Sequence, residues 1–275
     1  MGSAWGVFRN EAAKMARLKL IYLGPLCVAA ASVVFALSLR RLTPEAPANG
    51  WTLLALAAQL NVTGIIPIFL LIYGASLVAG ETDRGTIRFV LSRPVGRLAF
   101  LWGKTLAAWL YLGVLLASAA AAGLLAGAAF GRLGPAAGPA DSAWTPWGAA
   151  WQIAVCFLLS AIPLGAVALF ALTVSVYART LLGAICFAVG FWITLTLTQG
   201  YFAGELYAGP LDLCDLLFTG GLDRPLRVAQ SVASDSVGPW DEPGLAWGLA
   251  VSAAWIALFW AVSAAGFCRQ DLNRT

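Results

Sequence analysis

The sequence predicts an all-α, polytopic membrane protein with six transmembrane helices. Six stretches contain no charged residue, and the shortest of them is 20 residues long. A helix of about 20 apolar residues spans the hydrocarbon core of a bilayer, and a backbone in lipid must satisfy its own hydrogen bonds, which favours helices. We expect residues 1–275 to form a single transmembrane domain. The stretches are Leu20–Leu39, Ala46–Gly80, Thr105–Gly131, Ser142–Ala178, Thr180–Gly204 and Pro243–Cys268.

The segment before the first span, residues 1–19, is expected to form an amphipathic helix. Apolar residues recur at helical spacing, and polar or basic residues lie opposite them. A basic amphipathic helix beside a span lies in the headgroup layer of the membrane. The alternative is a helix packed on its neighbours. The apolar stripe is Trp5, Phe8, Ala12 and Met15, and the residues opposite it are Asn10, Lys14 and Arg17.

The basic residues predict which side of the membrane each loop faces. The two ends and alternate loops hold 12 Lys and Arg, whereas the other three loops hold 5. Basic residues are retained on the cytoplasmic side, so we expect a multi-pass protein of the cell inner membrane with both termini in the cytoplasm. The pair Arg40–Arg41 opposes this assignment, because it falls on the outer side.

The second stretch is longer than a straight span requires. We expect it to tilt, to kink or to project into the cytoplasm. Pro67 is the expected kink, since proline removes a backbone donor and clashes one turn back. Pro163 is expected to act in the same way in the fourth span.

The segment 203–242 is expected to be an external loop of 40 residues that carries seven carboxylates. Loops of this length usually have a function or structure of their own. The apolar positions between Leu211 and Phe218 recur at helical spacing, which predicts a short helix on the outer surface. The acidic loop is a candidate docking surface for an external protein.

Several kinds of chemistry are absent from the sequence. The chain has no histidine, which excludes Ser-His and Cys-His nucleophiles and histidine-ligated metals. No Asp, Glu or Arg stands at the middle of a span, where ion-coupled carriers place them. Gly103-Lys104-Thr105 lacks the earlier glycine of a P-loop, and we expect Lys104 to extend to the headgroups instead. We expect no catalytic residue, no metal site and no nucleic-acid partner.

The segment 81–97, between the second and third spans, carries the most specific signal. It holds charges of both signs in a chain that otherwise avoids them. Glu81, Arg84 and Arg88 are spaced to line one helical face. Gly85 permits a sharp change of direction, and Pro94 ends any helix before it. We expect a short amphipathic cytoplasmic helix here; a plain basic inner loop is the alternative.

The order of residues in this segment resembles the signature of type-2 ABC exporter permeases. Six spans, an N-terminal amphipathic helix with a Glu at position 11, and a long loop before the last span also fit that family. Within it, the run from Pro67 to Glu81 and the segment 211–217 are most similar to the permease of the nitrous oxide reductase maturation transporter. The residues that carry the family resemblance are Glu81, Gly85, Thr86, Ile87, Leu91, Ser92, Pro94, Arg97, Gly103 and Lys104.

The resemblance implies a transport subunit that is not itself an enzyme. It implies two copies of an ABC ATPase as partners, with ATP and Mg in those subunits and no cofactor in this chain. It also implies a second permease copy or a paralogue, and membrane lipid around both. The segment between the second and third spans would contact the ATPase through Glu81, Asp83, Arg84, Gly85, Thr86, Ile87, Arg88, Leu91, Pro94 and Arg97.

Polar residues in the second and fifth spans are candidates for lining a transport pathway. The alternative is that they form hydrogen bonds between helices. A stand-alone secondary carrier or channel, or a membrane scaffold for an external protein, are the alternative functions. The candidate pathway residues are Gln59, Asn61, Thr63, Thr194, Thr196, Thr198 and Gln199.

Overall fold

The computed structural model describes most of the chain, and its regular elements are all helical. The described residues are 4–17, 19–42, 49–85, 96–131, 133, 145–202, 216–234, 240, 242 and 244–269. The elements are α1 (Ala4–Arg17), α2 (Lys19–Leu42), α3 (Gly50–Leu60), the π-helical turn η1 (Asn61–Ile65), α4 (Ile66–Asp83), α6 (Arg97–Phe130), α7 (Pro146–Tyr177), α8 (Leu181–Phe202), α9 (Arg224–Ala233) and α10 (Leu245–Arg269).

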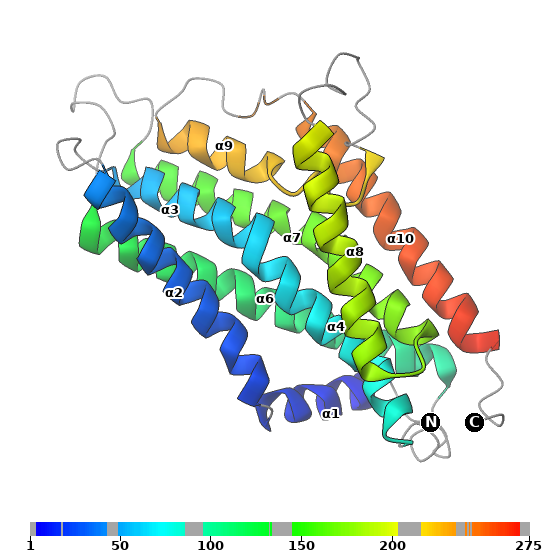
Figure 1. Ribbon diagram of the computed structural model, residues 1–275. Coiled ribbons are helices and arrows are strands. Elements are labelled where there is room, and N and C mark those ends of the chain that lie inside the picture. Colours follow the sequence, from blue (N-terminus) through cyan, green and yellow to red (C-terminus); the bar gives the residue numbers. More distant parts are fainter. Residues whose placement is uncertain are drawn as a thin grey trace.

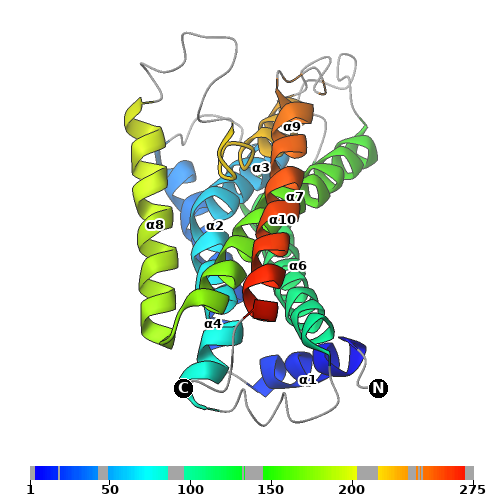
Figure 2. The ribbon, with the colours of Figure 1, turned by 90° about the vertical axis from the view of Figure 1, so that its right-hand side faces the viewer.

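Within the described ranges, six helices are long and apolar enough to cross a membrane, so the predicted polytopic fold is confirmed. They are α2, the continuous α3–η1–α4, α6, α7, α8 and α10. Figures 1 and 2 show these helices running between two ends of a bundle. Helix α1 lies across one end and α9 lies at the other, and we call these the α1 end and the α9 end.

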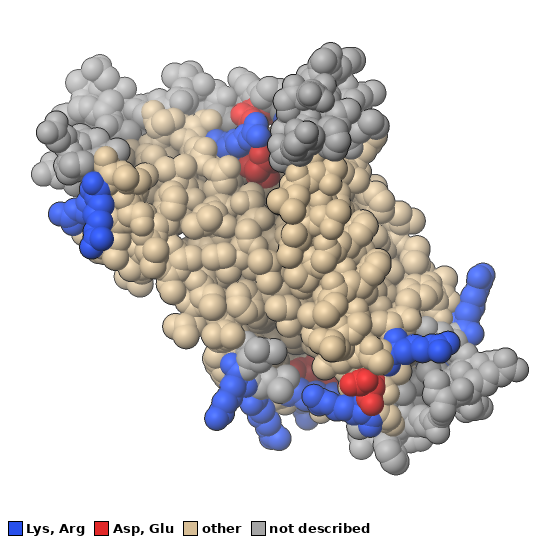
Figure 3. All heavy atoms as spheres, in the orientation of Figure 1, with Lys and Arg blue, Asp and Glu red and all other residues tan. Residues whose placement is uncertain are grey.

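Charge is segregated to the two ends of the bundle. Figure 3 shows the described Lys, Arg, Asp and Glu residues gathered at both ends, with an uncharged belt between them. Because lipid tails cannot solvate charge, such a belt is the surface that a bilayer requires. The chain is therefore a multi-pass membrane protein. The last turn of α10 lies at the α1 end, together with the start of α1 (Figure 2).

The second span is one long helix with an irregular turn. It covers 34 residues, or about 51 Å of helix, against a hydrocarbon core of about 30 Å. The π-helical turn η1 ends at Ile65, two residues before Pro67, which has no N–H to offer the carbonyl of Thr63. The predicted irregularity at Pro67 therefore takes the form of a π-helical turn, which widens the helix by one residue.

Helices α4 and α7 are in close contact at the centre of the bundle. A Cβ on Gly74 would lie 2.6 Å from Cβ of Ala171 and 3.1 Å from the carbonyl oxygen of Ala168. Small side chains allow helix backbones to approach each other in lipid. Of the windows that could cross the membrane, that of α7 is the most buried, so α7 is the central helix of the fold.

Helix α1 packs on α6 through a stripe that overlaps the predicted one at Met15 but also includes a charged residue. Its buried residues are Glu11 and Met15, and Val7 fits against Gly103, where a Cβ would lie only 2.6 Å away. Trp5, from the predicted stripe, is 63% exposed. The predicted apolar face is therefore turned into the bundle in part: Met15 is buried, Phe8 and Ala12 are half-buried, and Glu11 is buried beside them.

The described part of the segment 203–242 contains a helix that the sequence did not predict. The expected helix between Leu211 and Phe218 is wrong in its described part, since residues 216–223 form a 3₁₀ residue and turns. Residues 211–215 lie outside the described residues. The observed helix is α9, which begins with Pro225 in its first turn, a favourable place for proline.

Helix α9 packs into the α9 end of the bundle, against α3 and α7. Leu226, Val228 and Ala229 have no exposed surface. Asn49 accepts a hydrogen bond from the Trp51 amide, which caps α3, and donates one at 2.8 Å to the Ala233 carbonyl. A single side chain therefore joins the start of α3 to the end of α9.

Candidate functional site

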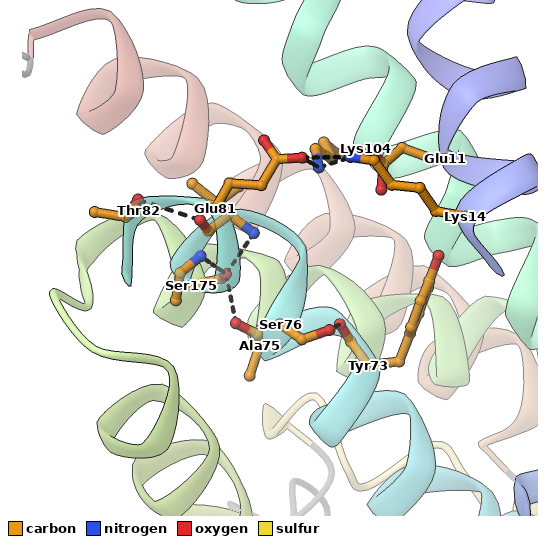
Figure 4. A network of polar contacts seen from close by, with 11 residues as sticks. Glu11, Lys14, Tyr73, Ala75, Ser76, Glu81, Thr82, Lys104 and Ser175 are labelled. Carbon is orange, nitrogen blue, oxygen red and sulfur yellow. Dashed lines mark hydrogen bonds and ion pairs between the residues drawn. The ribbon is translucent and has the colours of Figure 1, made fainter. Parts of the chain in front are cut away.

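Four charged side chains meet at the α1 end, where the second span ends and the third begins. They are Glu11 and Lys14 of α1, Glu81 of α4 and Lys104 of α6, and we call them the ion cluster (Figure 4). The Lys104 Nζ lies 2.7 Å from Glu81 Oε1 and 3.0 Å from Glu11 Oε1. The Lys14 Nζ lies 2.7 Å from each of the same two oxygens. Each ammonium thus bridges both carboxylates.

The ion cluster is buried on the side of α6 and open on the side of α1. The side chain of Lys104 is 1% exposed, that of Glu11 8%, that of Glu81 12% and that of Lys14 45%. Two positive and two negative charges balance, which is the condition under which charges are tolerated inside a protein. The prediction that Lys104 reaches the headgroups is wrong, because its ammonium finds carboxylate partners inside the bundle.

Local features of α6 bring Lys104 to this position. Gly103 leaves room for α1, with Val7 on top of it. The ammonium of Lys104 also lies 5.1 Å from the centre of the Phe100 ring, a distance at which a cation is attracted to the ring face. Phe100 in turn stacks on Phe267 of α10, with ring centres 5.3 Å apart. The first turns of α6 therefore contact α1, α4 and α10.

Glu81 would be poorly placed without the ammonium groups of Lys14 and Lys104. It stands in the last turn of α4, where the helix dipole is negative and disfavours a carboxylate. The two ammonium groups of Lys14 and Lys104 offset that repulsion. The position of the α4 end therefore depends on α1 and α6.

The contacts within the ion cluster also shift the pKa of Lys14. Partial burial lowers the pKa of Lys14, but its hydrogen bonds to Glu11 and Glu81 outweigh that effect and hold the pKa above its usual value. Lys14 is therefore charged at any physiological pH. It closes the ion cluster from the exposed side.

A second polar contact fixes α4 one to two turns from the cluster. The Ser175 hydroxyl of α7 accepts hydrogen bonds from the amides of Val78 and Ala79, at 2.9 and 2.8 Å, and donates one at 2.6 Å to the Ala75 carbonyl (Figure 4). Ser175 has no exposed surface. The end of α4 is thus bonded to α7 on one side and to the ion cluster on the other. Figure 4 shows Tyr73 pointing from α4 toward Lys14.

Arg97 anchors the opposite end of the connection between α4 and α6. It is the first residue of α6, and it donates hydrogen bonds to the carbonyl oxygens of Cys268, at 2.7 Å, and Phe267. These carbonyls belong to the last turn of α10, where a cation is favoured. Both ends of the segment 81–97 are therefore fixed to other helices.

The structure places only part of the predicted coupling segment. Glu81 lies in the ion cluster, and Asp83 and Arg84 are exposed at the end of α4. Gly85 has a φ of +67°, the left-handed conformation that glycine adopts readily. Arg97 begins α6. The predicted short helix and the predicted residues Thr86, Ile87, Arg88, Leu91 and Pro94 lie outside the described residues.

The predicted pathway residues do not gather in one place. Asn61 has no exposed surface and donates hydrogen bonds to the Ser32 hydroxyl and the Ala57 carbonyl, both at 2.9 Å. Gln59 of α3 accepts a hydrogen bond from Gln230 of α9.

The others bond within their own helix or to the turn after α8. Gln199 donates to Thr219 at 2.6 Å. Thr63, Thr194, Thr196 and Thr198 each donate to a carbonyl four residues earlier. Thr194 and Thr198 are exposed on the surface of α8.

Sequence reasoning missed the partnership of Lys14 and Lys104 with the two carboxylates. A signal was present: all four residues stand at the same predicted membrane side, and Glu11 is the only carboxylate in the first 80 residues apart from Glu45. A lone carboxylate among the three basic residues of an amphipathic helix indicates an internal partner.

The ion cluster is built to hold helices together. No group of three His, Cys, Asp or Glu within the described ranges is arranged to bind a metal ion. Each carboxylate oxygen that the ammonium groups contact is shared between two of them. The arrangement therefore suits a structural role, in which shared ion pairs hold α1, α4 and α6 together.

The fold and the ion cluster define a helical membrane protein with six candidate spans, in which buried charges join α1 to the second and third spans at one end of the bundle. The chain belongs to the family described as "Protein of unknown function (DUF2705)", which matches it over residues 24–273. No curated protein matches the chain.

Proposed function

We propose that the chain is the transmembrane permease subunit of an ABC transporter, in the cell inner membrane with its α1 end in the cytoplasm. ATP hydrolysis by a separate ATPase subunit, present in two copies with their ATP and Mg, would drive substrate export or force transmission. A second permease copy or a paralogue would complete the membrane part. The resemblance of the segment 81–97 to type-2 exporter permeases motivates this proposal.

One observation supports it most directly. Glu81 begins the segment that resembles the ATPase-contacting element, and the same Glu81 joins α4 to Lys14 of α1 and Lys104 of α6. At the other end of the segment, Arg97 is bonded to the last turn of α10. A force applied to this segment therefore reaches α1, α4, α6 and α10 together.

The contacts also support a route by which the proposed motion would travel. Glu81 is largely turned into the bundle, so its role is to position α4 relative to α1 and α6. Asp83 and Arg84, which are exposed two and three residues later, are available to a partner. The hydroxyl of Ser175 bonds α7 to α4, so a displacement of α4 would also move α7, the central helix.

The test is purification of the tagged chain from its source cells in a mild detergent, with identification of bound subunits by mass spectrometry. We expect an ATP-binding-cassette subunit in equal amount, and an ATPase rate that the permease raises. Transport by the purified chain alone in liposomes, driven by an ion gradient without ATP, would instead support the carrier or channel.

A variant then examines the coupling. Glu81→Gln keeps the size of the side chain but removes the charge, so the ATPase should still bind while its stimulation by the permease is lost. The matched control is Arg227→Gln, which removes an ion pair to Asp223 at the α9 end and should leave stimulation unchanged. Equal stimulation in both variants would contradict the coupling role of Glu81.

A further inference from the structure

A groove of about 330 Å³ opens on the membrane-facing side of the bundle, between α7 and α8. We call it the α7–α8 groove. It lies in the half of the bundle nearer the α1 end, since it includes the last turn of α7 and the first turns of α8. Its lining residues are Thr173, Val174, Tyr177, Ala178, Gly183 and Phe187.

The walls of the groove present carbon, because its hydroxyl groups are already bonded. Thr173 donates to the Leu169 carbonyl at 2.8 Å and also lies within hydrogen-bond distance of Ser263 and of the Phe259 carbonyl. Tyr177 donates to the Val262 carbonyl at 3.2 Å. Both groups thereby tie α7 to α10, and the groove favours hydrocarbon over a polar molecule.

Aromatic rings close the groove toward the middle of the membrane. Phe187 stacks on Phe191, with ring centres 6.0 Å apart, and Phe191 contacts Phe170 at 5.2 Å. Phe170 also contacts Phe218 and Phe259, which fill the space between α7, α8 and α10. Figure 2 shows α7 between α8 and α10 at this height. The groove is therefore closed toward the middle of the membrane and open to lipid at the side of the bundle.

A basic residue stands at the opposite end of the groove. Arg179 follows Ala178 directly in the turn from α7 to α8, and it is exposed. It makes no ion pair with any residue that the structure describes. The apolar groove thus has a positively charged residue at its end nearest the boundary of the membrane.

The geometry points to a binding site for one anionic phospholipid of the leaflet at the α1 end. Its acyl chain fills the α7–α8 groove and ends below Phe187, and its phosphate meets the guanidinium of Arg179. A groove in a bilayer does not stay empty, and hydrocarbon is the occupant that the surrounding lipid supplies. The charge of Arg179 selects an anionic headgroup. The site requires only the bilayer and is independent of the proposed function.

The test is native mass spectrometry of the full chain, released from nanodiscs that contain phosphatidylglycerol and phosphatidylcholine in equal amounts. Ala178→Trp fills the groove from an extended backbone position that accepts any side chain, so we expect the loss of one retained phospholipid per chain. The matched control is Leu182→Trp, on the exposed side of α8, which should retain it. Equal lipid counts in both variants would overturn the proposal.

The headgroup preference is tested separately, because Arg179 is exposed and its substitution leaves the core intact. Arg179→Gln should lower the preference for phosphatidylglycerol over phosphatidylcholine by about fivefold, the effect of one basic residue near an anionic surface. The control is Arg40→Gln, in the last turn of α2 at the other end of the bundle, which should not change this preference. An unchanged preference in Arg179→Gln, or a second copy of the chain that crosslinks through Ala178→Cys, would contradict the site.

Discussion

The hydroxyl of Ser175 in α7 donates a hydrogen bond at 2.6 Å to the carbonyl oxygen of Ala75 in α4. The hydroxyl oxygen of Ser175 also accepts hydrogen bonds from the amides of Val78 and Ala79. A side chain from one helix thus bonds to three backbone groups of another, in the last turns before the ion cluster. Helices in lipid lack a hydrophobic force between them, so such contacts decide how they pack.

Ser175→Ala should therefore destabilise the protein by about 1–3 kcal/mol, the cost of leaving buried polar groups without partners. The control is Ser160→Ala, which is equally buried but bonds only to Cys156 of its own helix. Thermal unfolding in detergent should show a lower midpoint for Ser175→Ala alone. Identical midpoints would mean that α4 restores its own hydrogen bonds without cost.

Lys104→Met should destabilise the protein by about 3–5 kcal/mol, because it leaves buried carboxylates without one of their ammonium partners. The double variant Lys104→Met with Glu81→Gln should recover part of that loss, since it removes a charge of each sign. The control is Asp83→Asn, an exposed substitution in α4 near Glu81. It should change the free energy of unfolding by less than about 0.5 kcal/mol. Additive effects of the two cluster substitutions in a double-mutant cycle would show that Glu81 and Lys104 are not coupled.

Gly103→Ala should push α1 off α6, because the new Cβ would lie 2.6 Å from Cβ of Val7. We expect a loss of about 1–3 kcal/mol, as for other overpacked contacts. Gly113 of the same helix has no atom within 4 Å of such a Cβ, so Gly113→Ala should be neutral or slightly stabilising. Proteolysis of α1 in the two variants provides the measurement, and equal protection in both would contradict the close contact.

The stabilising effect of Lys14 should depend on pH in the alkaline range. Its folded pKa is raised by Glu11 and Glu81, whereas an unfolded lysine titrates at about 10.4. The contribution is therefore fully present below that pH and is lost as the pH rises through the folded pKa. The difference in unfolding midpoint between the natural chain and Lys14→Met should stay constant from about pH 7 to 10 and shrink above that. A difference that is the same at all these pH values would mean that the Lys14 charge contributes nothing.

Much of the fold was predictable because it depends on local properties. Each of the six charge-free stretches corresponds to a helix long and apolar enough to cross a membrane, and the irregularity predicted from Pro67 ends two residues before it. The π-helical form of that irregularity was not predictable, since it depends on how Asn61 and its neighbours pack. Helix α9 was not predicted, because it is stabilised by packing against α3 and α7, which are distant in the sequence.

The position of the site in the sequence was predictable, but the ion pairs that form it were not. From the residues alone, charges are expected to concentrate where the second and third spans meet, because charge is costly anywhere deeper in the bilayer. Only the tertiary structure decided that Lys104 turns inward to Glu81, 23 residues away, and that Lys14 reaches the same carboxylate across 67 residues. An ammonium can reach the headgroups or a buried carboxylate from the same position in a helix. The choice depends on which helices lie beside it, and that is a property of the assembled bundle.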